Sequence, residues 1–532
     1  MALARTHSVA LVGVQGHVVE VEADIANGLV GMILVGLPDT ALREARDRIR
    51  SAIVNSGEQW PQRRITVGLS PASLPKRGSG FDLPIAVAIL AAAGVLKAAA
   101  LAGVMFLGEL GLDGQLRPVR GVLPAAVAAA AAGFSHVVVA RANAEEAALV
   151  PGVRVLAAPA LATLLAWMRG DQPDGAPGVE EFAGGSGALS RPSPGERAAG
   201  AGADTDDARL VPSPDLSDVL GQPIARRAAE ICAAGGHHLS LLGPPGAGKT
   251  MLAERMPAIL PRLDPEAALE VTSIHSIAGR LPASCPLVTE PPFCGPHHTA
   301  SKAAIVGGGS GIIHPGAASL AHRGVLFLDE APEFGRDVLD ALRQPLESGE
   351  VVIARSGTTA RFPARFTLVM AANPCPCAKA AASPRSACSC SPATRRRYLG
   401  RLSGPLLDRV DVKVELLPVG RAELLSDRKF TETSAVVAAR VEQARQRAAR
   451  RLRGTPWRLN AEVPGSELRR TFAPGRGALA PLERAMEIGE ISARGVDKVV
   501  RVAWTLADLA GQDRPTIDEC GYALGLWLGV VK

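Results

Sequence analysis

Aromatic residues make up only 3% of this 532-residue chain, and four of its eight cysteines are clustered rather than spread. A secreted domain stapled by disulfides distributes many cysteines along a short chain, so that class is excluded. The longest apolar run, Leu83–Leu96, contains Pro84, is closed by Lys97 and is too short to cross a bilayer. The first residues lack the basic start and apolar core of a signal peptide. We therefore expect a soluble, cytoplasmic protein with no membrane partner.

The chain is long enough for several domains, because hydrophobic cores stop growing beyond about 300 residues. From 170 to 214 it is rich in Gly, Ala, Pro, Ser and acids, with almost no apolar periodicity. Such a segment cannot bury enough apolar surface to offset its ordering entropy. We predict a flexible linker at 170–214, an α/β domain at 1–169, a second α/β core at 215–415 and a helical domain at 416–532.

Within residues 1–169, strand-like runs alternate with helical ones, which predicts one self-contained α/β unit. We expect strands at 8–14, 17–23, 32–37, 64–69, 104–108 and 136–140, and helices at 40–55, 84–96 and 123–132.

Residues 243–250 read Gly-Pro-Pro-Gly-Ala-Gly-Lys-Thr, a complete phosphate-loop pattern. An apolar stretch precedes it and a helical stretch follows it, which is the context that the pattern requires and that a chance Gly-rich turn does not explain. Lys249 is expected to reach the β- and γ-phosphates of ATP, and the Thr250 hydroxyl to hold Mg²⁺. The nucleotide-binding residues are then Gly243, Pro244, Pro245, Gly246, Ala247, Gly248, Lys249 and Thr250.

A second apolar run, 324–328, ends in Asp329 and Glu330. A buried strand would place both carboxylates at the sheet edge where ligands of open α/β sheets bind. Asp329 is then expected to hold Mg²⁺ with Thr250, and Glu330 to polarise the attacking water. Two acids after a strand are common by themselves, but their position downstream of a phosphate loop favours ATP hydrolysis.

Two further polar residues extend this pattern. A third strand-like run ends before Asn373, whose amide can orient the attacking water or sense the γ-phosphate. Arg409 lies between Asp408 and Asp411. At a subunit boundary such an arginine can reach a neighbour's γ-phosphate; the alternative is a local surface ion pair that contributes little. The residues alone leave both interpretations open.

Five segments, in order, resemble the magnesium-chelatase-like AAA+ ATPases, in particular the ComM/YifB branch: GPPGAGKT, GVLFLDE, MAANPCPC, SGPLLDRVD and SARGVDKVVRVAWTLADLAG. The similarity covers nearly the whole chain. It implies a central AAA+ core, a C-terminal helical lid and a homo-oligomeric ring, expected to be a hexamer, with ATP at each subunit boundary. It also makes Asn373 the first sensor, Arg409 the arginine finger and Arg501 the second sensor.

The N-terminal region resembles the proteolytic domain of Lon-type proteases, which has a ribosomal S5 domain 2-like fold, through Leu74–Asp82 and Gly108–Pro118. In that family a lysine activates a serine. Aligned on the shared Pro-Lys-x-Gly, the serine position falls on Gly80, with Ser79 one residue early, and the lysine position falls on Leu123. Because the Ser–Lys dyad is missing, we predict a scaffold or regulatory domain and not an active protease.

Cys375, Cys377, Cys388 and Cys390 form two Cys-x-Cys pairs on either side of a ten-residue segment. Four thiolates at this spacing can close a tetrahedral Zn²⁺ site, with nearby cations favouring the thiolates. Cys-x-Cys is tighter than the usual zinc spacing, so a cysteine-bearing turn without metal is the alternative.

Basic residues outnumber acidic ones ten to four between 421 and 458. A helix of this composition can follow a phosphate backbone, with Arg450, Arg451 and Arg453 as candidates for DNA contact; the alternative is a solvated face. Residues 351–362 predict a β-hairpin with a Ser-Gly turn. In the family that this chain resembles, such a hairpin points into the ring pore, which makes Arg355 a further candidate. Scarce aromatics imply electrostatic contact rather than base stacking.

Two functions remain open. The first is a ring-forming ATPase that moves single-stranded or branched DNA, like the family's branch-migration helicase of natural transformation and recombination. The second is a chelatase-type chaperone motor that remodels a protein partner for metal insertion. Both need the same ATP site, so the motifs do not separate them.

Overall fold

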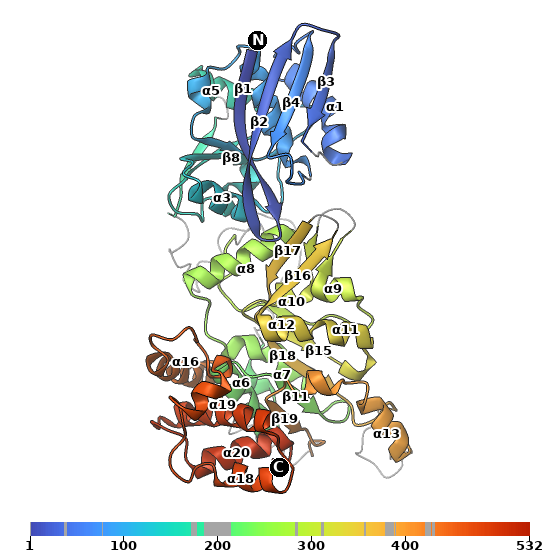
Figure 1. The fold of residues 1–532 in the computed structure, drawn as a ribbon, viewed down its shortest axis with the longest axis vertical. Helices are drawn as coiled ribbons and strands as arrows, with labels where there is room; N and C mark the ends of the chain where they lie inside the picture. Colours follow the sequence, from blue (N-terminus) through green and yellow to red (C-terminus); the bar gives the residue numbers. More distant parts are fainter. Residues whose placement is uncertain are drawn as a thin grey trace.

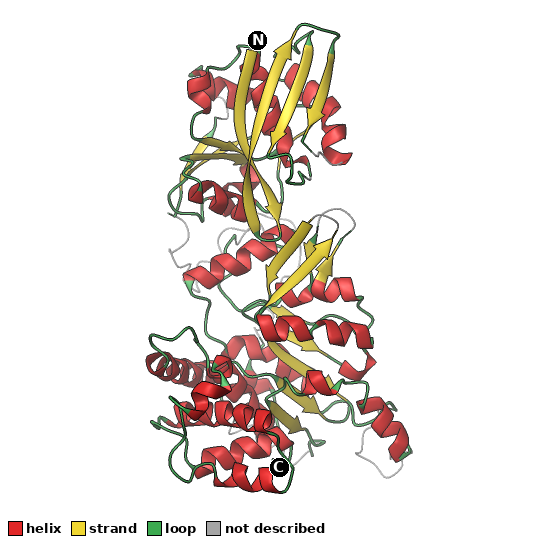
Figure 2. Cartoon of the chain, in the orientation of Figure 1, coloured by secondary structure: helices red, strands yellow, loops and turns green. Residues whose placement is uncertain are grey.

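The computed structural model describes residues 2–36, 40–76, 78–171, 178–185, 214–281, 286–309, 313–355, 358–377, 388, 390–420, 427 and 431–531. Figure 1 shows three stacked regions: the N-terminal residues at the top, a central α/β core and the C-terminal helices below. The sheets of the upper two regions give way to helices at the C-terminal end (Figure 2). The chain is therefore a mixed α/β protein of several parts, as expected from the sequence.

The N-terminal region is built on an eight-stranded sheet of order β10-β9-β8-β5-β1-β2-β4-β3. Its strands are β1 (Ala2–Val12), β2 (Gln15–Ala26), β3 (Gly31–Val35), β4 (Arg64–Ser70), β5 (Val104–Phe106), β8 (His136–Ala140), β9 (Arg154–Ala158) and β10 (Glu180–Ala183), with the small pair β6 (Glu109–Leu110) and β7 (Leu116–Arg117) outside it. Its helices are α1 (Thr40–Asn55), α2 (Asp82–Ala92), α3 (Val122–Ala131), α4 (Ala144–Ala147) and α5 (Leu161–Arg169).

All six strands and three helices expected here from the alternation of runs are present; 40–55 and 136–140 match as predicted, and the others have shifted ends. The apolar run at 83–96 forms α2, which is buried on nearly every side and packs against β1 and β2. One prediction was wrong in part: residues 180–183, assigned to the linker, form β10, which pairs antiparallel with β9. The composition of this segment is polar and gave no reason to expect a strand. Its backbone N–H and C=O groups are nevertheless paired with those of β9.

The central core is a five-stranded parallel sheet of order β12-β15-β18-β11-β19. Its strands are β11 (Leu239–Leu242), β12 (Phe293–Cys294), β15 (Val325–Leu328), β18 (Thr367–Ala372) and β19 (Val412–Glu415). Every residue of β15 and β18 is buried, as expected for parallel strands covered on both faces. The helices of the core are α6 (Pro223–Gly235), α7 (Lys249–Arg255), α8 (Pro265–Ala278), α9 (Lys302–Val306), α10 (Ala317–Leu320), α11 (Arg336–Ala341), α12 (Arg343–Ser348), α13 (Pro392–Leu399) and α14 (Gly404–Leu407).

Two small antiparallel pairs stand above this sheet. One joins β13 (Gly307–Gly308) to β14 (His314–Pro315), and the other is the hairpin of β16 (Glu350–Arg355) and β17 (Thr358–Pro363). The predicted hairpin is confirmed, although its Ser-Gly turn lies outside the described residues. The β1–β2 ribbon of the N-terminal region reaches down to this hairpin, where Val14 packs against Ala360 and Phe362 (Figure 1).

The C-terminal region is helical, with α16 (Ser434–Arg451), α17 (Gly465–Arg469), α18 (Ala480–Glu487), α19 (Ala493–Ala510) and α20 (Ile517–Leu528). Its central helix is α19, which starts at the Ser492 cap and ends at Gly511 in the left-handed conformation. One continuous apolar core joins α16, α19 and α20 to α6 and to β11 and β19. These helices therefore share one core with β11, the strand that precedes the phosphate loop. Among the described helices, none has the length and apolar character needed to cross a membrane.

Candidate functional site

The phosphate-loop pattern forms the turn between β11 and α7, as its flanks predicted. Gly246 and Gly248 have φ angles of 78° and 89°, which L-residues with a side chain rarely adopt. A Cβ atom at either position would meet nothing within 4 Å, so the conformation and not crowding requires glycine there. The loop therefore has the backbone shape and the open surroundings that a phosphate chain requires.

Lys249 closes this loop from inside. Its Nζ donates hydrogen bonds to the carbonyl oxygens of Gly243 (2.7 Å) and Pro244 (2.9 Å) and to Oδ1 of Asn373 (3.1 Å). Burial lowers the pKa of its ammonium, and Asp329 and Glu330 partly offset this effect. All three ammonium protons thus have acceptors within the protein, one of them the amide predicted to act as a sensor.

Asp329 and Thr250 meet beside the loop, where Thr250 Oγ1 donates to Asp329 Oδ2 at 2.8 Å. The other oxygen, Oδ1, accepts the Glu330 backbone N–H at 2.9 Å. A hydroxyl and a carboxylate in contact are hard oxygen ligands that fit Mg²⁺. Glu330 has a φ of 49°, a strained conformation for a residue with a side chain, which is typical of functional positions.

Two further side chains lie at this site. His298 Nδ1 lies 3.5 Å from Glu330 Oε2. Tyr398 of α13 is buried, its phenol lies next to the Asn373 backbone, and burial together with Glu333 and Glu330 raises its pKa to about 12. From the sequence, the Pro-His-His-Thr motif around His298 is expected to shape a loop near the nucleotide or the pore, but its contact with Glu330 was not predicted.

Arg409 and Arg501 lie apart from these residues, with no ion pair or hydrogen bond to them in the described part of the chain. Arg409 is only 8% exposed and bonds Glu347 and the Pro405 carbonyl, so the surface pair with its neighbouring aspartates does not form. Its Nε is buried with no partner among the described residues. Arg501 donates from Nε to the Val463 carbonyl at 2.7 Å.

A buried ion pair connects the Arg409 segment to α19. Lys498 Nζ lies 2.6 Å from Asp411 Oδ1 and also donates to the Arg409 carbonyl at 2.8 Å. Burial alone would raise the pKa of the Asp411 carboxyl, but Lys498 and His237 hold it well below its usual range. Lys498 therefore connects the segment of Arg409 and Asp411 to the same helix that carries Arg501.

Lys498→Met is expected to lower the free energy of unfolding by about 3–5 kcal/mol, because it leaves the Asp411 carboxylate buried and unpaired. Reversible denaturant titration measures the loss. The double change Lys498→Met with Asp411→Asn is the control and should recover much of it. Since the folded-state pKa of Asp411 lies below its unfolded value of 3.8, the wild-type contribution is present above about pH 4 and disappears as the pH falls. Equal losses in the single and double variants would contradict this account.

The predicted DNA-contact residues divide into two groups. Arg355, Arg450 and Arg453 are exposed and make no ion pair or hydrogen bond with the described residues. Arg451 is a correction: it bonds Asp508 and Asn460 and stacks on the Trp504 ring at 4.1 Å, so it supports the helical core and is removed from the candidates.

The same explanation applies to most of the basic stretch around α16. Arg440 pairs with Glu230 and Glu432, while Arg445 and Arg447 donate to backbone carbonyl oxygens. The three basic residues Arg421, Arg428 and Lys429 lie outside the described residues. The charge excess in the sequence therefore overstates the number of cations that α16 offers to a ligand.

The four predicted zinc-ligand cysteines do come together. Their Sγ atoms all lie within 4.8 Å of one another, with Cys375 to Cys377 at 3.0 Å, Cys375 to Cys388 at 3.2 Å and Cys377 to Cys388 at 3.4 Å. Hydrogen bonds led by that from Cys375 lower the pKa of the Cys388 thiol to about 6.

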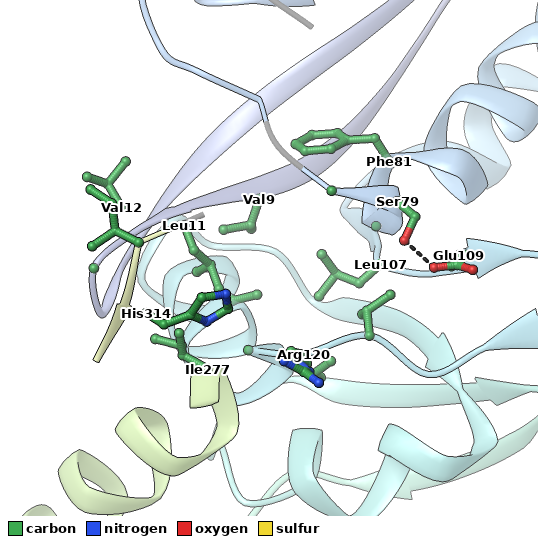
Figure 3. A pocket seen from close by; sticks show the side chains of 18 of the residues that line it. Val9, Leu11, Val12, Ser79, Phe81, Leu107, Glu109, Arg120, Ile277 and His314 are labelled. Atoms are coloured by element: carbon green, nitrogen blue, oxygen red, sulfur yellow. Dashed lines mark hydrogen bonds between the residues drawn. The ribbon is translucent and has the colours of Figure 1, made fainter. Parts of the chain in front are cut away.

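A separate cavity of about 460 Å³ lies between the N-terminal region and the central core. Figure 3 shows Ser79 hydrogen-bonded to Glu109 on one side of it and Ile277 and His314, from the core, on the other. Leu123, at the position of the lysine in Lon-type proteases, is fully buried in an apolar cluster. The absence of protease activity stays a prediction.

A parallel sheet with strand order 2-3-4-1-5, a phosphate loop after its first strand and an acid pair after its third defines a P-loop ATPase core of AAA+ type. Three family profiles match the chain: magnesium chelatase subunit ChlI at 215–424, a second profile of this subunit at 21–143, and the ChlI C-terminal profile at 431–526. These profiles match the central, N-terminal and C-terminal regions, respectively. The protein is therefore an AAA+ ATPase related to magnesium chelatase.

Full-length relatives narrow the family. The chain is 51% identical to the Mycobacterium tuberculosis protein Rv2897c, over 98% of both chains. It is 41% identical to YifB of Escherichia coli, over 96% of this chain and 94% of YifB. It is also 41% identical to the competence protein ComM of Haemophilus influenzae, over 99% of this chain and 97% of ComM. The chain belongs to the magnesium-chelatase-like ComM/YifB family.

Proposed function

We propose that this protein assembles into a homo-oligomeric ring, a hexamer, that hydrolyses ATP at its subunit boundaries to move single-stranded or branched DNA, as a branch-migration helicase of recombination and natural transformation. The observation that supports DNA as the substrate is Arg355, whose exposed guanidinium at the end of β16 has no ion pair or hydrogen bond with the described residues. The similarity to a relative named as a competence protein agrees with this proposal.

The chemistry follows from the contacts of the site. Bound Mg²⁺ would be held by Thr250 and Asp329 and would neutralise phosphate charge. Lys249 exchanges its bonds to the Gly243 and Pro244 carbonyls for phosphate oxygens, which keeps its ammonium paired. Glu330 accepts the proton of the attacking water while the Asn373 amide orients that water. Zn²⁺ takes no part in these steps.

The two arginines remote from the loop complete this proposal. Arg409 acts on the nucleotide of the neighbouring subunit, and Arg501 on α19 couples loss of the γ-phosphate to movement of the helical region. The Lys498–Asp411 pair links the two arginines within one chain and provides a rigid connection between them. We assign 416–532 as the lid that moves and 215–415 as the core.

The second hypothesis, a chaperone motor for metal insertion, is not favoured. Such a motor acts on a partner protein, and no feature of the described residues identifies one. Arg355, in contrast, has no ion pair among the described residues and can bind the phosphates of a nucleic acid directly. Such contacts release counterions and do not depend on base sequence.

Arg355→Ala is expected to abolish most of the stimulation of ATPase activity by single-stranded or forked DNA, and to leave the basal rate within about twofold of wild type. Phosphate release is measured with and without DNA at modest salt. The matched control is Arg361→Ala, on the same hairpin, whose guanidinium already pairs with Glu350 at 2.7 Å. Equal effects of the two changes, or a wild-type rate that DNA does not alter, would contradict DNA as the substrate of the hairpin.

Measuring DNA binding at several salt concentrations separates the hairpin from α16. Arg450→Ala with Arg453→Ala removes two exposed guanidinium groups, and Arg458→Ala, which removes an arginine near Asp264 and Glu266, is its control. If α16 also follows the phosphate backbone, the double variant should weaken DNA binding and flatten its dependence on salt, whereas the control should not.

A further inference from the structure

The four clustered thiols lie where the end of β18 meets the start of α13. No step proposed for ATP hydrolysis uses them. Cys375 and Cys377 follow the end of β18, two and four residues after Asn373. Cys388 and Cys390 come before α13, whose first turn is capped by Ser391. The cluster therefore joins two segments that are separated in sequence by residues 378–387.

Both segments contact residues at or next to the ATP site. Asn373 accepts a hydrogen bond from Lys249 at 3.1 Å. On the other side of the cluster, α13 carries Tyr398, whose phenol meets the Asn373 backbone, and is followed by Arg401, which pairs with Glu333 at 2.8 Å. A link between the segment of Cys375 and the segment of Cys390 would therefore fix the position of the Asn373 amide relative to Tyr398 and Arg401.

The distances between the sulfur atoms distinguish disulfide bonds from a shared metal ion. In a disulfide, two sulfur atoms approach to about 2.0 Å, and four cysteines sort into pairs. Here Cys375, Cys377 and Cys388 are mutually 3.0 to 3.4 Å apart, so each sulfur has two close sulfur neighbours. A tetrahedral ion with Zn–S distances of about 2.3 Å would separate its ligands by a few tenths of an ångström more than this.

The surroundings also favour a closed site over a reactive one. Cys375 is buried, and the other three thiols are half-buried. Of the charged groups nearby in the sequence, Arg395, Arg396 and Arg397 of α13 are cationic and exposed, and their charge favours thiolates over thiols. Four sulfur ligands leave no position for water, which is the pattern of structural rather than catalytic zinc.

We propose that Cys375, Cys377, Cys388 and Cys390 bind one structural Zn²⁺ that fastens the end of β18 to the start of α13. The ion does not contact ATP. It fixes the positions of Asn373 and Tyr398 and the direction in which α13 presents its three arginines.

Elemental analysis of the purified full-length chain is expected to find about one zinc per chain. Replacing Cys388 and Cys390 by Ser should reduce this to background, while the control Cys294→Ser, a free cysteine of the core outside the cluster, should keep it. A chain without zinc overturns the proposal, as does a visible absorption spectrum with bound iron, because four thiolates also suit iron–sulfur clusters.

Native chain provides a test that does not depend on whether variants fold. Alkylation followed by mass spectrometry should leave the four cysteines unmodified until a chelator is added, and should then modify all four without a reductant. A requirement for reductant would show disulfides and overturn the zinc site. Hydrogen exchange of residues 392–399 should become faster when zinc is removed; unchanged exchange there would overturn the fastening of α13.

Discussion

Chains carrying Glu330→Gln are expected to bind ATP and assemble as the wild type does, but to hydrolyse ATP about 100-fold or more slowly. The amide keeps the size of the side chain and removes the carboxylate that we propose as the base for the attacking water. ATP binding is retained because Lys249, Thr250 and Asp329, which we propose bind the phosphates and Mg²⁺, are unchanged. Single-turnover hydrolysis together with nucleotide-binding measurements separates the two effects.

The control for this prediction is Glu333→Gln. Glu333 is three residues further along, is exposed and pairs with Arg401 at 2.8 Å. Its loss removes an equal charge near the same strand end, and the rate should stay within about twofold of wild type because exposed pairs contribute little. Near-normal turnover of the Glu330→Gln chain would show that another residue activates the water.

The nucleotide loop and the acid pair were predictable because their chemistry is local in sequence. A glycine pattern between an apolar run and a helical run specifies a turn, and a carboxylate after a buried strand must lie at the sheet edge. The contact of Thr250 with Asp329 follows from the order of the parallel strands, which brings the ends of β11, β18 and β15 together.

The contacts of the arginines were not predictable, because they depend on partners distant in sequence. Arg451 and Arg453 are two residues apart on a basic stretch, yet one bonds Asp508 of α19 and the other is exposed. Charge counts do not distinguish a cation that completes a core from one that meets solvent. The contact of His298 with Glu330 was not predicted for the same reason, since Glu330 follows β15 and is distant in sequence.

The arginine-finger role predicted for Arg409 requires a neighbouring subunit, so within one chain only the surroundings of Arg409 bear on it. A surface arginine held by neighbouring aspartates would be exposed, whereas Arg409 is 8% exposed and bonded to Glu347 and Pro405. Its buried Nε has no partner among the described residues, and such groups need an explanation. A role at a neighbouring subunit's γ-phosphate provides one, if the bond to Glu347 exchanges for phosphate during assembly.

Arg409→Ala and Lys249→Ala chains should each be nearly inactive, since an arginine finger contributes about 1,000-fold or more to the rate. Mixed in equal amounts, they should recover up to roughly a quarter of wild-type activity, because in head-to-tail rings about one boundary in four pairs an intact Lys249 with an intact Arg409. The control mixes Arg409→Ala chains with chains that carry both Lys249→Ala and Arg409→Ala. This mixture contains no intact Arg409 and should recover nothing. If the first mixture also stays at background, Arg409 acts within its own chain, and its bond to Glu347 then serves stability rather than catalysis at the boundary.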